Sequence, residues 1–214
     1  DILTTLPSMF TGPLTESIVA RAQEKSLIHI RVHDLRQWAT DNHYTTDDRP
    51  YGGGPGMIMM IEPIDRALEA IHAKKGTPGQ LILLTSAKGE MYTQSTAQAY
   101  AQCKRLVFIC GHYEGVDERV AQFLIDKEVR IGDYVLTGGE IPTMVMVDSI
   151  VRLLPGVLGD DKSTKDESHS SPGYLEYPQY TRPEEYKGVK VPEVLLSGNH
   201  KDIVAWRKDK STQK

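Results

Sequence analysis

Short apolar runs that end in turn residues alternate along the chain with amphipathic segments, and this alternation limits the possible folds more than any other feature. LILLTS at 81–86 and RLVFICG at 105–111 have the length and apolar character of strands buried on both faces. Residues 64–76 instead place apolar side chains at helical spacing and end at a glycine. This order predicts an α/β fold, a parallel sheet with helices on both faces.

The remaining elements of this domain follow the same alternation. We expect strands at 1–7, 28–35 and 129–136, and helices near 10–24, 114–127 and 140–154.

The composition changes at residue 159. Residues 159–173 contain no aliphatic, Tyr, Trp or Phe side chain, so they predict a mobile linker between a domain at 1–158 and a second segment at 174–214. That segment is rich in Tyr and Pro and then begins a helix, for which Asn199 is the candidate cap. It is too short for an independent core, so we expect a partial, mostly helical C-terminal domain that is cut short or packs on a partner.

Charge and cysteine content limit the class of protein. The net charge is −4, but residues 187–214 are basic and residues 159–186 are acidic, which leaves room for a local nucleic-acid site. Cys103 and Cys110 lack the number and spacing for disulfides or a metal site, so we expect buried thiols in the reducing cytoplasm. Since no apolar stretch has the roughly 18 residues that a bilayer span needs, we expect no membrane association.

Three Gly-rich loops follow expected strands, at 49–57, 110–119 and 131–142. Ligands of open parallel sheets bind at such loops, outside the carboxyl ends of the strands. A tight turn explains one loop of this kind, but three in one domain favour a binding site. None has the spacing of a P-loop or of the dinucleotide fingerprint, which disfavours a nucleoside triphosphate or a nicotinamide cofactor.

Six ordered motifs resemble the bacterial tRNA (guanine-N1)-methyltransferases of the SPOUT superfamily, from the first residue to about Arg207. The resemblance implies a C-terminal trefoil knot in the α/β domain, a homodimer with active sites at its interface, and tRNA as substrate. It further implies S-adenosylmethionine as methyl donor, Mg²⁺ as a candidate assisting ion, and the guanine just 3′ of the anticodon as target. The motifs are DDRPYGGGPGM (47–57), GHYEGVDERV (111–120), IGDYVLTGGE (131–140), LPGVLG (154–159), YPQYTRP (177–183) and VPEVLLSGNH (191–200).

Motif matching also implies which residues contact the cofactor. Two positions are notable: Ala87 stands where the family usually has Pro, and His112 where Arg is also common. The expected cofactor residues are Leu84, Thr85, Ser86, Ala87, Gly111, Tyr113, Glu114, Gly115, Arg130, Ile131, Gly132, Tyr134, Leu136, Gly138 and Gly139.

Guanine N1 carries a proton at neutral pH, so its methylation needs a base near N1 and a cation or donor near O6. The family pattern places the base on Glu167, with Asp166 as the alternative; a solvated acidic loop is the competing interpretation. It places the cation on Arg152, which the helix spacing alone would pair with Asp148. Glu114 could balance the positive sulfonium or cap the following helix.

Five cations of the basic end, together with Arg182 of the YPQYTRP motif, are candidates for phosphate contacts, or else are solvated surface residues. They are Arg182, Lys187, Lys190, Lys201, Arg207 and Lys208. Two other functions compete with methyl transfer. A non-catalytic RNA-binding module would need neither the linker acid nor Arg152, and a metabolic enzyme for a phosphorylated small molecule would not need the basic end.

Overall fold

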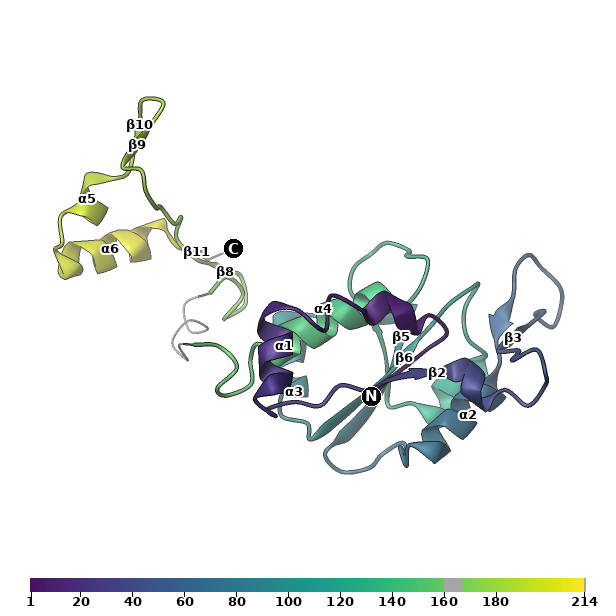
Figure 1. Ribbon diagram of the computed structural model, residues 1–214. Coiled ribbons are helices and arrows are strands. Elements are labelled where there is room, and N and C mark those ends of the chain that lie inside the picture. The colour runs from purple at the N-terminus through teal and green to yellow at the C-terminus, as the bar shows by residue number, and fades with distance from the viewer. Residues whose placement is uncertain (160–166, 214) are drawn as a thin grey trace. The chain divides into compact units, whose positions relative to one another are not determined.

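The computed structural model describes residues 1–159 and 167–213. The chain divides into two compact units, Asp1–Gly159 and Asp160–Lys214 (Figure 1).

A five-stranded sheet with the strand order β2-β1-β6-β5-β7 forms the centre of the first unit. Every neighbouring pair of strands is parallel, which confirms the expected α/β fold. The strands are β1 (Ile2–Thr4), β2 (Val32–Asp34), β5 (Gln80–Met91), β6 (Arg105–Cys110) and β7 (Lys127–Arg130); β3 (Asp47–Asp48) and β4 (Ile58–Met59) form a separate antiparallel pair.

Alternate residues of the central strands supply two different cores, because successive side chains of a strand point to opposite faces. In β5, Leu83 belongs to one core, whereas Ile82 and Leu84 belong to the other. Helices therefore cover both faces, and Figure 1 shows α1, α3 and α4 together. The first core receives η1 (Pro7–Phe10), α1 (Ser17–Glu24), α3 (Gln94–Tyr100) and α4 (Glu140–Val151); the second receives η2 (Leu35–Trp38), α2 (Ile61–Ala70) and η3 (Val120–Leu124).

Several expected elements are wrong in extent. The strands expected at 1–7 and 28–35 are reduced to β1 and β2, and the helix expected near 10–24 begins only at Ser17.

Two further elements, which border the carboxyl edge of the sheet, are also shorter than expected. The helix expected over 114–127 is only the π-helical turn η3, because the main-chain N–H groups of Glu114 and Asp117 donate to carbonyls of Met57 and Met59 instead. The strand expected over 129–136 ends at Arg130, whose side chain bonds the Asp133 carboxylate at 2.9 Å. Residues 114–117 and the residues after Arg130 therefore form loops at the carboxyl edge of the sheet.

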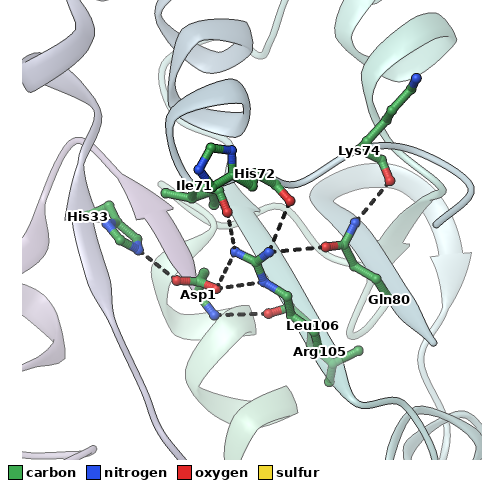
Figure 2. Close-up of polar contacts among 8 residues, drawn as sticks. All are labelled: Asp1, His33, Ile71, His72, Lys74, Gln80, Arg105 and Leu106. Atoms are coloured by element: carbon green, nitrogen blue, oxygen red, sulfur yellow. Dashed lines mark hydrogen bonds and ion pairs between the residues drawn. The ribbon is translucent and has the colours of Figure 1, made fainter. Parts of the chain in front are cut away.

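A polar network around Arg105 ties β6 to neighbouring segments (Figure 2). The guanidinium donates to the Asp1 carboxylate at 3.0 Å and to the main-chain carbonyls of Ile71 and His72 at 2.8 and 3.2 Å. The other Asp1 oxygen lies 2.8 Å from His33 Nε2. One side chain thus satisfies acceptors from β1 and from the end of α2.

Arg105→Ala is therefore expected to lower the free energy of unfolding by about 2–4 kcal/mol, because it leaves a nearly buried carboxylate and two carbonyls without their charged donor. Urea denaturation measures the loss. Lys104→Ala is the matched control, since Lys104 is exposed and should change stability by less than about 0.5 kcal/mol. Equal losses in both variants would contradict the role of the network.

Within the second unit, the described residues 167–213 form short strand pairs and two helices. Asn199 caps α6 as expected, with its Oδ1 accepting the Lys201 N–H at 3.2 Å. Trp206 of this helix packs against Tyr180, with 6.3 Å between ring centroids. The elements are β8 (Tyr174–Leu175) paired with β11 (Thr212–Gln213), β9 (Glu185–Tyr186) paired with β10 (Val189–Lys190), α5 (Glu193–Leu196) and α6 (His200–Lys210).

Candidate functional site

A cavity of about 420 Å³ lies in the first unit, where an irregular stretch of β5 meets the loops that follow β6 and β7. This stretch arises because the pairing of β5 with β7 shifts register between Thr85 and Glu90. Residues 86–89 therefore leave the regular pairing and join the lining of the cavity at 86–88. The volume is in the range of small-molecule sites.

Glycines allow these three segments to approach one another closely. The Gly139 N–H donates to the Gly111 carbonyl at 2.7 Å, and the Gly111 N–H donates to Thr85 Oγ1 at 3.1 Å. A Cβ on Gly139 would overlap Thr85 Oγ1 and lie 2.7 Å from the Gly111 nitrogen. Each segment thus fixes the position of the next.

All of the expected cofactor residues line this one cavity. His112, Val135 and Thr137 also line it, and they lie inside the loops 111–115 and 131–139 that motif matching assigns to the cofactor. Sequence reasoning missed the other lining residues, and those from β4, η3 and β7 had no signal in the sequence. The missed residues are Ile58, Lys88, Val116, Glu118, Ala121, Glu128, Val129 and Pro142.

Charged and titratable side chains line the cavity. Lys88 bonds Glu118 and lies 3.8 Å from Glu128, and the Glu118 bond raises the pKa of Lys88. Burial raises the pKa of Tyr113, and so does its hydrogen bond to Asp47. The site can therefore present both charges to a zwitterionic ligand.

Glu114 lines the cavity and lies against Gly56 of the β3–β4 loop. Its alternative role as the cap of the next helix is wrong, because the helical residues begin only at Glu118. Instead, Asp117 accepts the main-chain N–H of Arg119 at 2.9 Å, and the Arg119 side chain, together with this bond, lowers the pKa of the Asp117 carboxyl.

The predicted catalytic residues Arg152 and Glu167 do not occur among the described residues that line the cavity. Arg152 is half-buried and follows the last residue of α4, where its N–H donates to the Asp148 carbonyl at 3.2 Å. Glu167 is in the second unit, where its carbonyl accepts the Ser170 N–H at 3.0 Å. Asp166 lies outside the described residues. The roles of these three side chains stay predictions.

The six expected RNA-binding cations are all exposed and lie in the second unit. The Arg207 guanidinium lies 4.8 Å from the centre of the Tyr177 ring, and the Lys187 ammonium lies 5.3 Å from that of Tyr186. The Lys190 ammonium is 3.8 Å from Glu185. These pairs combine aromatic faces with positive charge.

Other classes of site receive no support in the described part of the chain. Burial raises the pKa of the Cys110 thiol, which lies 3.3 Å from Thr143 Oγ1, so this thiol is not a nucleophile. Within residues 1–159 and 167–213, no three His, Cys, Asp or Glu side chains cluster as a metal site requires. In the same ranges, every helix is too short or too polar to cross a bilayer.

Comparison with known proteins gives consistent matches along the chain. The model of the family described as tRNA (Guanine-1)-methyltransferase TrmD matches residues 1–214. A tRNA (guanine-N(1)-)-methyltransferase of Geobacillus kaustophilus is 54% identical over 100% of this chain and 86% of its own length. Those of Geotalea uraniireducens and Chloroflexus aurantiacus are 52% and 55% identical, covering 99% and 97% of this chain and 84% and 81% of their own.

Proposed function

The chain belongs to the tRNA (guanine-1)-methyltransferase family, and we propose that it transfers a methyl group from S-adenosylmethionine to N1 of the guanine 3′-adjacent to the anticodon in tRNA. The observation that carries this proposal is the convergence of all the expected cofactor residues on one cavity. When bound, S-adenosylmethionine supplies an electrophilic methyl group on a positive sulfonium.

The residues of the cavity suit this cofactor. Gly111 and Gly139 leave room for close approach to the main chain, and Leu84, Ile131 and Leu136 provide apolar surface for an adenine ring. Exposed carboxylates of the lining, such as Glu114, can balance a sulfonium charge. The trefoil knot that the family resemblance implies is part of this proposal.

Proton removal from guanine N1 is assigned to Glu167, with Asp166 as the alternative base. Arg152 would stabilise the negative charge that builds on O6. We assign residues 1–158 to the cofactor-binding domain, 159–173 to a linker that carries the base, and 174–214 to tRNA binding. The target base would leave its stack to reach the cavity.

We also propose a homodimer whose interface includes α4 and the loop before it. Ile141 and Val145 of α4 are 48% and 43% exposed, and Val135 of that loop is 84% exposed. Apolar surface of this kind marks an interaction site. A tRNA-modifying enzyme with free thiols, Cys103 and Cys110, is consistent with a cytoplasmic location.

Calorimetric titration tests the cofactor assignment. We expect S-adenosylmethionine to bind and ATP not to bind. Gly139→Ala should weaken S-adenosylmethionine binding at least about tenfold, because overpacking of this kind displaces the main chain. Gly159→Ala is the control, since a Cβ there meets no atom within 4 Å. Binding of ATP alone would favour the metabolic enzyme instead.

Salt dependence tests the separation of the two binding sites. Affinity for tRNA should fall about a thousandfold or more between 50 and 200 mM salt if the six exposed cations contact phosphates. Affinity for S-adenosylmethionine should hardly change, because it displaces few counterions. An equal response of the two ligands, measured by fluorescence anisotropy and calorimetry, would refute this separation.

A further inference from the structure

A buried carboxylate lies next to residues that line the cavity. Glu140, the first residue of α4, is only 1% exposed. Its Oε1 accepts the hydroxyl of Thr4 at 2.7 Å, and the helix N-terminus favours its negative charge. One neutral donor does not compensate the burial of a carboxylate, so Oε2 calls for a second partner.

The nearest basic group to that oxygen is His112. Its Nδ1 lies 3.8 Å from Glu140 Oε2, and this nitrogen is buried without a hydrogen-bond partner among the described residues. The ring itself lines the cavity. An unpartnered ring nitrogen therefore faces an under-compensated carboxylate, just beyond the length of a hydrogen bond.

The surrounding contacts hold this arrangement in place. The His112 N–H donates to Met59 Sδ at 3.2 Å, and the ring packs edge-on against Tyr113 with 4.9 Å between centroids. A Cβ on Gly138 would overlap Glu140 Oε2 and lie 2.6 Å from His112 Nδ1. The two side chains thus meet where loops 111–115 and 138–139 cross.

We propose that Glu140 is a positioning residue that pairs with a protonated His112 and so holds these two loops in the conformation that accepts the methyl donor. This inference rests on the proposed function only for the identity of the donor. The titratable groups that face His112 are Glu140 from α4 and Tyr113 from its own loop; β4 contributes only Met59.

NMR of the His112 ring tests the pair without any ligand. Because a nearby carboxylate favours the protonated ring, Glu140→Gln should move the ring-nitrogen chemical shifts of His112 toward those of a neutral imidazole at the same pH. Glu90→Gln, at an exposed carboxylate that bonds Lys127, should leave them unchanged. Unchanged ring-nitrogen shifts in Glu140→Gln would overturn the pair.

Binding of S-adenosylmethionine tests the positioning role. Glu140→Gln and His112→Leu should each weaken binding about tenfold, and the double variant should lose little more, because the two residues act as a unit. His112→Arg, which keeps the cation, should restore most of the affinity. If Glu140→Gln does not fold, the affinities of His112→Leu and His112→Arg for S-adenosylmethionine still test the proposal. Equal affinity in these two variants would overturn it. Failure of the wild-type protein to bind would reject the proposed cofactor, whereas the NMR result would still decide the pair.

Discussion

Glu167→Gln is expected to lower single-turnover methyl transfer by about 10²–10⁴-fold, the usual contribution of a positioned general base. Affinity for S-adenosylmethionine should stay nearly constant, because Glu167 lies outside the unit that holds the cavity. Rapid-quench measurement with saturating cofactor and tRNA separates this chemical step from binding.

The pH profile assigns the role of the side chain. A general base acts only when it is deprotonated, so wild-type transfer should fall as pH drops through the pKa of the carboxyl group. The Gln variant should lack this acidic limb. Asp166→Asn is the matched control and should have a small effect on the rate of transfer. A severe loss of rate in Asp166→Asn with a near-normal rate in Glu167→Gln would identify Asp166 as the base instead.

Arg152→Ala has the second-largest expected effect, a loss of about 10²–10³-fold in the rate of transfer, comparable to removal of one donor to a developing oxyanion. The guanidinium is assigned to O6 of guanine, where negative charge increases as N1 loses its proton. Single-turnover rates at saturating tRNA measure this loss separately from weaker tRNA binding.

Two further variants make the Arg152 result specific. Arg152→Lys keeps the charge without the planar fork and should recover part of the rate. Arg21→Ala removes an exposed arginine whose side chain bonds the main-chain carbonyl of Ser17, and should change nothing. A rate for Arg152→Ala within threefold of wild type would remove Arg152 from the mechanism.

The central strands of the sheet were predictable because strands buried on both faces consist of continuous apolar runs, which are visible in the sequence. LILLTS and RLVFICG lie in β5 and β6, where alternate side chains supply two cores. The order of the strands was not predictable, since it depends on contacts distant in sequence. The extent of η3 and β7 was missed for the same reason: β4 takes the hydrogen bonds that a helix at 114–117 would have made.

The candidate cofactor residues were predictable through motifs, whereas their charged neighbours were not. Gly111 and Gly139 stand in recognisable Gly-rich loops. Glu118 lies inside the motif at 111–120 and Glu128 lies outside the motifs, but both line the cavity, and nothing local in the sequence distinguishes either from a solvated acid. The Glu140–His112 pair likewise needs the fold, because 28 positions separate its members in the sequence.

The most direct test of the central claim is to identify the methylated nucleoside. The purified chain, S-adenosylmethionine and a tRNA transcript with guanine 3′ of the anticodon should give N1-methylguanosine at that position, detected by mass spectrometry after nuclease digestion. A transcript with adenine there should give none. Methylation of another atom or another position, with wild-type cofactor binding intact, would contradict the account.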